Sequence, residues 1–340
     1  MHQTWLWIGF NIFVLGMLAV DLGVFNRKAH VISVKEAARW TVVVVICALI
    51  FNAGIFWLEG STRGLEFTAG YLIELALSVD NIFVFILIFA YFKVPPMYQH
   101  RVLFWGIFGA LVMRGAMIAG GAFLIDRFHW VIYIFGAFLV FTGIRMALQD
   151  EMDIEPEANP VLKIVRKFFP ISPSYDGQKF FTTITVGGVA KRAVTPLLLV
   201  LLLVETTDLI FAVDSIPAVF AVTDDPFLVY TSNVFAILGL RSMYFLLAGV
   251  IDKFHYLQLG LSTVLVFIGL KMLVTYFDIH IPIALSLGVV ASVLAISIGA
   301  SLLFPKELEE NSPLDPSNDE VLPGDEDQAS SSGSGSPRNL

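Results

Sequence analysis

The stretch LVETTDLIFAVDSIPAVFA, from Leu203 to Ala221, decides the fold of this chain. It is a long apolar segment that carries three carboxylates, Glu205, Asp208 and Asp214, and one proline, Pro217. A carboxylate at the depth of a membrane costs about 2.5 kcal/mol or more, so it is rare there and usually serves a function. The stretch therefore predicts a transmembrane helix with acidic residues that face the protein interior.

A second segment has the same design. LIELALSVDNIFVF, from Leu72 to Phe85, carries Glu74, Asp80 and Asn81 among apolar residues. We therefore expect a pair of acid-bearing transmembrane helices with the other spans packed around them.

Composition places the chain among integral membrane proteins. Of its 340 residues, 57% are hydrophobic and 15% are charged, and the mean hydropathy is +0.79. A soluble domain would carry about 25% charged residues. Long, unbroken apolar runs indicate helices rather than a barrel. The single cysteine, Cys47, excludes an internal disulfide, and no pattern suggests a nucleic-acid surface.

The fold class expected is all-α, a polytopic membrane protein with about nine transmembrane helices. Each span needs about 20 mostly apolar residues. The apolar runs that meet this length are Trp5–Phe25, Trp40–Leu58, Phe67–Phe92, Val102–Ile125, Trp130–Leu148, Val194–Val222, Phe227–Ile251, Tyr256–Phe277 and Ile281–Phe304.

The chain also repeats itself. Residues Leu124–Met146 match Val250–Met272 without a gap, and both begin with an IDxFH motif. Three spans separate the corresponding positions, and an odd number of spans gives the two copies opposite orientations. Inverted repeats are typical of secondary transporters. The remaining matched pairs are Glu74 with Asp208, Asp80 with Asp214, Asn81 with Ser215, and Arg114 with Arg241.

These features divide the chain into six parts. The insert combines an amphipathic stretch, VLKIVRKFF, with a hairpin pattern around Gly187 and Gly188. The tail has the composition of a disordered segment. The parts are two N-terminal spans (1–66), a first three-helix repeat (67–148), a cytoplasmic insert (149–193), a second three-helix repeat (194–277), a last span (278–304) and an acidic tail (305–340).

The basic residues of the loops predict the orientation. They gather in the loop after the first span, in the loop after the third span and in the insert, which all lie on one side if the spans alternate. Basic loops stay in the cytoplasm. We therefore expect the N-terminus outside and the insert and the C-terminus in the cytoplasm.

The acids outnumber the bases that lie deep in the spans. The five deep acids are opposed by two bases, Arg114 and Arg241, which leaves 5 − 2 = 3 unmatched negative charges. Unmatched carboxylates in hydrocarbon must be protonated or bound to a cation. We expect the two arginines to hold acids in place. The deep acids are Glu74, Asp80, Glu205, Asp208 and Asp214.

The same residues predict the ligand. Asp80 and Asp214 are expected to form the central site, helped by the Asn81 amide and the Ser215 hydroxyl. Pro217 cannot donate to the Val213 carbonyl, so a helix break there would add one more oxygen ligand. This hard oxygen set suits Mn²⁺, Mg²⁺ or Ca²⁺ as a transported ion, and we expect no tightly bound cofactor.

A purely structural role stays open for each acid, since buried polar networks also hold membrane helices together. The sequence favours the functional interpretation for Asp80 and Asp214 and, less strongly, for Glu74 and Asp208. For Glu205 it favours neither.

The motifs ELALSVDNIFVF, VETTDLIFAVDSIPAVFAVTDDPF, TSNVFAILGLRSMYFLLAG and IPIALSLGVV strongly resemble the TerC family, specifically its Alx-like branch. The resemblance covers about residues 21–299. It implies a bacterial inner-membrane protein of the LysE-type exporter superfamily, linked to Mn²⁺ export and to tellurite resistance. It also implies that Glu74, Asp80, Asn81, Glu205, Asp208 and Asp214 form the metal path.

The leading hypothesis is thus Mn²⁺ efflux in exchange for protons, by a protein that is not an enzyme. The expected partners are the lipid bilayer, a divalent metal ion and protons, with protein partners unspecified. The alternative is a scaffold that transports nothing and delivers metal to secreted proteins or assists membrane-protein assembly. Tellurite chemistry by an enzyme is disfavoured, because no redox thiol pair, nucleotide loop or nucleophile–base pair is found.

Overall fold

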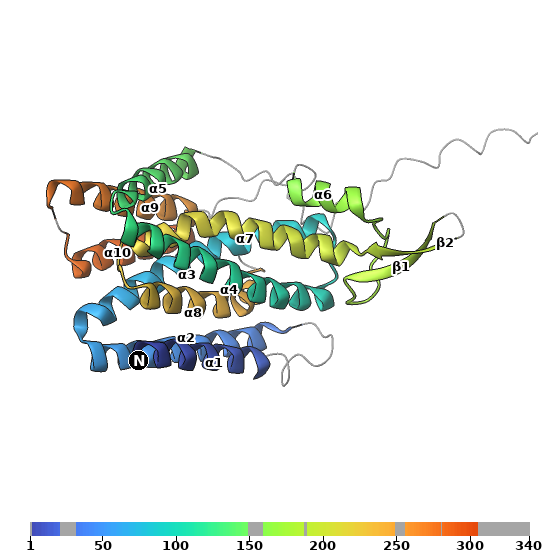
Figure 1. The fold of residues 1–340 in the computed structure, drawn as a ribbon, viewed down its shortest axis with the longest axis horizontal. Coiled ribbons are helices and arrows are strands. Elements are labelled where there is room, and N and C mark those ends of the chain that lie inside the picture. The colour runs from blue at the N-terminus through green and yellow to red at the C-terminus, as the bar shows by residue number, and fades with distance from the viewer. Residues whose placement is uncertain are drawn as a thin grey trace, which may run out of the picture. The chain divides into compact units, whose positions relative to one another are not determined.

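The computed structural model describes residues 2–20, 32–148, 159–186, 189–248, 256–279 and 281–304. It is an all-α polytopic membrane protein, as the sequence predicts (Figure 1). The acidic tail, the end of the first predicted span and the second IDxFH motif lie outside the described residues. The helices that coincide with predicted spans are α1 (His2–Val20), α2 (Val34–Glu59), α3 (Ser61–Tyr91), α4 (Pro96–Arg127), α5 (Val131–Leu148), α7 (Pro196–Phe220), α8 (Pro226–Leu247), α9 (Leu257–Val274) and α10 (Ile283–Leu303).

The helices that coincide with the predicted spans fall into two groups by length and apolar character. Among the described residues, seven helices are long and apolar enough to cross a membrane, and neither α1 nor α8 is one of them. The described part of α1 is a shorter apolar helix. In α8, 16 of 22 residues are buried, among them Thr231, Ser232 and Asn233. Because protein rather than lipid surrounds α8, polar side chains are tolerated along it.

The second and third helices are separated by one residue, Gly60. Its φ of 92° lies in a region that disfavours residues with a Cβ, so a glycine suits this abrupt change of direction. The third helix begins six residues before the predicted Phe67, so the expected boundary at residues 66 and 67 falls inside α3. The apolar pattern does not predict the start of α3, because polar side-chain contacts rather than apolar residues stabilise it. Arg63 forms an ion pair with Asp225, and Thr223 donates to Glu66 (2.7 Å).

Pro217 does not break its helix, contrary to the expectation from sequence. α7 continues for three residues beyond Pro217 and ends at Phe220. A proline in a helix removes one hydrogen bond, here to the Val213 carbonyl. Its position in the last turn and the buried residues on both sides of it explain why the helix persists.

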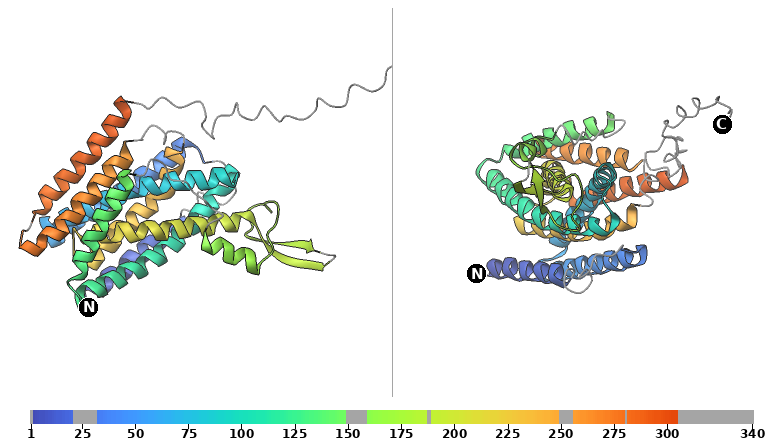
Figure 2. Two further views of the ribbon diagram at one scale, coloured as in Figure 1. Left: turned by 90° about the horizontal axis from the view of Figure 1, so that it is seen from above. Right: turned by 90° about the vertical axis from the view of Figure 1, so that its right-hand side faces the viewer.

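The helices pack in pairs that join the two halves of the chain. α3 packs on α8, α4 on α7, and α5 on α9. Figures 1 and 2 show these helices together, with α2 against α8 and α10 against α9 and α3. α1 joins through aromatic contacts, since Phe10 packs against Phe51, Phe227 and Phe235.

Glycines bring α5 and α9 into backbone contact. A Cβ on Gly269 would lie 2.6 Å from the Gly136 carbonyl oxygen, and a Cβ on Gly136 would lie 3.0 Å from the Gly269 carbonyl oxygen. A Cβ on Gly143 would meet the Ser262 carbonyl oxygen at 2.8 Å. Small residues permit such close approach between membrane helices. This contact fixes α5, which also reaches the candidate site.

The insert contains both elements that its sequence predicts. The amphipathic stretch forms α6 (Pro160–Phe168), capped by the Asn159 side chain, and Leu162 buries it against the core. The hairpin pattern forms β1 (Phe181–Val186) and β2 (Val189–Val194), which pair in antiparallel register from Phe181 opposite Val194 to Val186 opposite Val189. The expected boundary at residues 193 and 194 therefore falls at the end of β2.

Candidate functional site

A fully buried ion-pair network lies between α3, α4 and α7. Arg114, 1% exposed, donates through Nη2 to Asp208 Oδ1 (2.8 Å) and through Nε to Asp208 Oδ2 (3.1 Å). Its Nη1 forms an ion pair with Glu74 Oε1 and lies 3.4 Å from Ser215 Oγ. Both acids are at most 3% exposed. One arginine thus holds two carboxylates, and these are the two acids that the sequence repeat matches with each other.

A small cavity lies beside this network. It measures about 10 Å³, close to the least space that one water molecule needs. Asp80 and Asn81 come from α3, and Asp214 and Ser215 come from α7. The structure therefore brings four predicted site residues to one cavity. Leu77, Met146 and Phe211 complete its lining.

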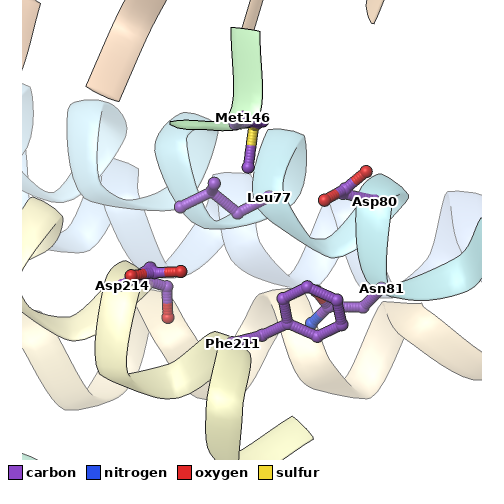
Figure 3. A pocket seen from close by; sticks show the side chains of 7 residues that line it. Leu77, Asp80, Asn81, Met146, Phe211 and Asp214 are labelled. Carbon is purple, nitrogen blue, oxygen red and sulfur yellow. The ribbon is translucent and has the colours of Figure 1, made fainter. Parts of the chain in front are cut away.

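The two aspartates face the cavity from different helices. In Figure 3, Asp80 and Asp214 lie on opposite sides of Leu77, and Met146 of α5 lies close to Leu77. Because both carboxylates line one small cavity away from bulk water, their like charges repel each other. A cation or a proton between them would relieve this repulsion.

Residues of α5 also reach Asp214. The Thr142 hydroxyl and the Arg145 guanidinium both lie near the Asp214 carboxylate. α5 therefore supplies a hydroxyl and a positive charge on one side of Asp214.

A second cavity also adjoins the ion-pair network. It also measures about 10 Å³, and Asp208 and Arg241 supply its charged lining. Ser215 lines the first cavity and Asp208 the second, and Arg114 contacts both residues. The guanidinium of Arg114 thus contacts a residue that lines each of the two cavities.

The structure places two predicted site residues away from the first cavity. Val213, whose carbonyl oxygen was the expected ligand, is not among the residues that line the cavity. The Glu205 carboxylate lies against Gly109 of α4, where a Cβ would collide with it. Its Oε2 is buried without a hydrogen-bond partner among the described residues.

The oxygen set of the first cavity fits a hard divalent cation in part. Among the described residues, no three His, Cys, Asp or Glu side chains gather in a metal-binding group. The cavity offers two carboxylates, one amide and one hydroxyl. Small hard cations such as Mg²⁺ are commonly held by one or two carboxylates and keep several waters, so a two-carboxylate site does not conflict with a transported ion.

Sequence reasoning missed the residues that α5 contributes, Thr142, Arg145 and Met146. The repeat predicts that α5 is a helix but assigns it no site residue. A single sequence does not show which face of α5 packs against α7. It also missed Ser78, which lies one turn beyond Glu74 and shares its helix face. The spacing of four residues between Glu74 and Ser78 is the sequence feature that could have identified Ser78.

Comparisons with known proteins identify the family. The family model described as "Integral membrane protein TerC family" matches residues 59–309. An uncharacterized membrane protein of Myxococcus xanthus is 53% identical over 298 residues, which are 88% of this chain and 92% of the relative. No solved structure shows significant similarity to this chain.

Two further relatives extend this result. A protein of Escherichia coli K12, whose provisional name is membrane-bound redox modulator Alx, is 50% identical over 86% of this chain and 92% of its own. An uncharacterized membrane protein of Rickettsia bellii is 39% identical over 87% of this chain and 97% of its own. The match to the family model covers most of the membrane-spanning region, and the relatives match nearly their whole length. The chain therefore belongs to the TerC family of integral membrane proteins.

Proposed function

We propose that the protein exports a hard divalent cation, foremost Mn²⁺, from the cytoplasm, with protons moving inward in exchange. The observation that carries the proposal is the shared cavity, which Asp80 and Asp214 line together with Asn81 and Ser215. Each of the two acid-bearing helices supplies one carboxylate and one neutral oxygen ligand. A cation at this place would be bound by both halves of the molecule at once.

Competition between cation and protons supplies the coupling. Any positive charge that enters the cavity lowers the electrostatic repulsion between the two carboxylates that line it. A divalent cation neutralises both, and two protons do the same. Binding of one therefore opposes binding of the other, which is the requirement for exchange. A cation that binds from the cytoplasm would displace protons into the cytoplasm, and protons from the outer solution would take its place when it leaves on the outer side.

The paired packing supports alternating access. α3 on α8 corresponds to α7 on α4 when the repeats are exchanged, and α5 on α9 corresponds to itself. Such a pattern is expected if residues 67–148 and 194–277 form an inverted repeat. Transporters with inverted repeats bind their substrate where the two copies meet, and one group of helices rocks or opens against another around that site.

The positive charge of Arg114 is an electrostatic barrier to the transported cation. In this conformation the guanidinium holds Glu74 and Asp208 and contacts a lining residue of each cavity, Ser215 of the first and Asp208 of the second. A cation that comes close to this fixed positive charge is repelled, and the repulsion is strong in a medium of low dielectric constant. Movement of the cation past this point requires the helices to shift, which is how one side of the site stays closed.

The other acids then take roles along the path. With the N-terminus outside, the start of α7 faces the cytoplasm, so Glu205 and Asp208 lie on the inner side of Asp214. They would receive the ion from the cytoplasm, and Glu74 would release it to the outside. Bacterial relatives and seven span-like helices are consistent with this placement in the inner membrane.

The test is Mn²⁺ flux in sealed vesicles of known orientation. Wild-type protein is expected to move Mn²⁺ and protons in opposite directions. Asp214→Asn and Asp80→Asn are each expected to fold and to lower the flux about 100-fold, because a charged ligand contributes about 3 kcal/mol. Asp224→Asn is the matched control, since Asp224 is exposed in the loop after α7.

Each outcome decides between hypotheses. Wild-type flux in the Asp214→Asn vesicles would overturn the site. Wild-type protein that binds Mn²⁺ but moves none of it would favour a metal-delivery scaffold over a transporter. Tellurite resistance, which the family resemblance implies, would follow from altered cation balance rather than from chemistry on tellurite.

The name of the Escherichia coli relative points to a redox role for that protein. This chain has one cysteine, Cys47 of α2, so no pair of its own thiols can form a disulfide. An effect on redox balance would therefore be indirect, through the concentration of a redox-active metal such as manganese.

A further inference from the structure

Three buried oxygens on α3 have no hydrogen-bond partner among the described residues. They are Glu74 Oε2, Ser78 Oγ and Asn81 Oδ1. All three residues are at most 2% exposed. A polar group that is buried in a membrane protein without a partner is costly, so such groups are normally satisfied by protein, water or a ligand.

The three residues lie on one face of the helix. Positions 74, 78 and 81 are spaced by four and three residues, so their side chains fall within an arc of about 60°. The rise from Glu74 to Asn81 is about 10 Å, with Ser78 between them. Asn81 lines the cavity of Asp80 and Asp214, and Glu74 contacts Arg114. Ser78 therefore lies on the line that joins the cavity to the ion-pair network.

The hydroxyl of Ser78 differs from other hydroxyls in the described helices. Buried serines and threonines in a helix commonly donate to a carbonyl one turn back. Thr231 does so at 2.8 Å, Ser242 at 2.9 Å and Ser262 at 2.7 Å. Ser78 Oγ makes no such bond, although the Glu74 carbonyl lies four residues back. Its oxygen is left available to another ligand.

We propose that Ser78 belongs to the ion path, as the middle member of an oxygen row on α3 that runs from Asn81 to Glu74. The inference rests on the proposed transport function and adds a residue to it. The ligand is a partly hydrated hard cation, for which a hydroxyl, an amide oxygen and a carboxylate are suitable ligands. Oxygens about 5 Å apart along a helix let the cation exchange one ligand for the next.

The oxygen row also explains how the cation avoids Arg114. The guanidinium binds Glu74 through Oε1, whereas Oε2 is the atom left without a partner. A cation that moves along the row reaches the carboxylate oxygen that Arg114 does not use. The same row, filled with water in the absence of the cation, would satisfy the three oxygens.

The single cysteine of the chain permits a direct test. In a Cys47→Ala background, a cysteine replaces Ser78, Leu77 or Ser262 in turn, and membranes are treated with aminoethyl methanethiosulfonate, with and without Mn²⁺. Leu77 lines the cavity and reports on the proposed central site. Ser262 of α9 is equally buried, but its hydroxyl bonds its own helix, so it is the matched control.

We expect the Leu77→Cys and Ser78→Cys thiols to react and Ser262→Cys to stay unreactive. With Mn²⁺ at ten times its Kd, both reactions are expected to slow roughly tenfold. Protection of Leu77→Cys alone, with Ser78→Cys unreactive or unaffected by Mn²⁺, would overturn the oxygen row and leave the central site standing. Absence of Mn²⁺ protection at both positions would overturn both proposals.

A second measurement does not depend on the reagent. Ser78→Ala is expected to lower Mn²⁺ flux about tenfold, the effect of losing one ligand worth about 1.4 kcal/mol. Ser78→Thr keeps the hydroxyl and is expected to retain more flux than Ser78→Ala, and Ser262→Ala is expected to match wild type. Equal flux in Ser78→Ala and wild type would count against Ser78 as a ligand.

Discussion

The interface of α5 with α9 and the interface of α3, α4 and α7 are both buried, but different forces hold them together. α5 and α9 meet through glycines, with backbone against backbone. α3, α4 and α7 meet through Arg114, Glu74 and Asp208, and leave polar oxygens without partners within the described chain. The first interface gains mainly from close packing, with a hydrogen bond from Gln258 of α9 to the Met146 carbonyl of α5 (3.1 Å), whereas the second depends on charge balance.

This difference separates a rigid contact from one that can change. Packed cores have few alternative arrangements, because a small shift already loses much of the dispersion energy. An ion pair with unused oxygens nearby has other partners available, including a cation or water. Under the proposed function, the α5–α9 contact would act as the scaffold and the α3–α4–α7 contact would take part in ligand exchange.

The largest effect is expected from removal of Arg114. Arg114→Met leaves Glu74 and Asp208 buried without their shared partner, which destabilises a protein by about 3–5 kcal/mol. Thermal unfolding in detergent should show a large drop in Tm. A triple variant that adds Glu74→Gln and Asp208→Asn should recover most of the loss, because neutral amides need no counter-ion. A triple variant as unstable as Arg114→Met would show that lost packing, not charge, is responsible.

A somewhat smaller effect is expected at the glycine contact. Gly269→Val places side-chain atoms where the Gly136 carbonyl oxygen lies, 2.6 Å from the Cβ position. Overpacking of this kind costs about 1–3 kcal/mol. Gly288→Val in α10 is the control, since a Cβ there meets nothing within 4 Å. Similar melting temperatures for the two variants would contradict the rigid role of the α5–α9 contact.

A third substitution tests whether Glu205 takes part in ligand exchange. Gly109→Ala pushes a methyl group against the Glu205 carboxylate, which is the far end of a flexible side chain and can move. The stability change is expected to stay within about 1 kcal/mol. Mn²⁺ flux should fall by more than the change in stability explains. Unchanged flux, with folded protein at wild-type levels, would remove Glu205 from the path.

The smallest effect is expected in the insert, where an exposed carboxylate, that of Asp176, accepts hydrogen bonds in contact with water. Asp176 accepts from the Thr182 hydroxyl (2.8 Å) and from Lys179, and these hydrogen bonds lower the pKa of its carboxyl. A lowered folded-state pKa means that the contribution to stability is present above the ordinary pKa near 4 and is lost as the pH falls through the folded value.

Asp176→Asn should therefore weaken the contact with β1 slightly at neutral pH and have no effect in acid. Hydrogen exchange of the β1 amides in wild type and variant, at pH 7 and below pH 3, measures the difference. A variant that differs equally from wild type at both pH values would show that charge is not involved. Water screens this pair, unlike the buried pairs of Arg114.

Much of the fold is predictable from the sequence, because long apolar runs have one stable form in a membrane. A helix coincides with each predicted span within the described residues, and the insert forms the helix and the hairpin that its pattern indicates. The prediction was wrong where polar contacts extend a helix, as at the start of α3. It was also wrong about a break at Pro217, where one lost hydrogen bond did not end the helix.

The sequence by itself determined which residues carry the charge and that two segments share one design. The Asp80 and Asp214 segments were identified from residue types and spacing alone, since acids in apolar runs are conspicuous. Only the tertiary structure decided which groups meet. Arg114 holds acids from two other helices, α5 brings Thr142 and Arg145 to Asp214, and Ser78 keeps a free oxygen within the described chain. Contacts between helices depend on their rotation and separation, which side-chain packing across the whole bundle fixes.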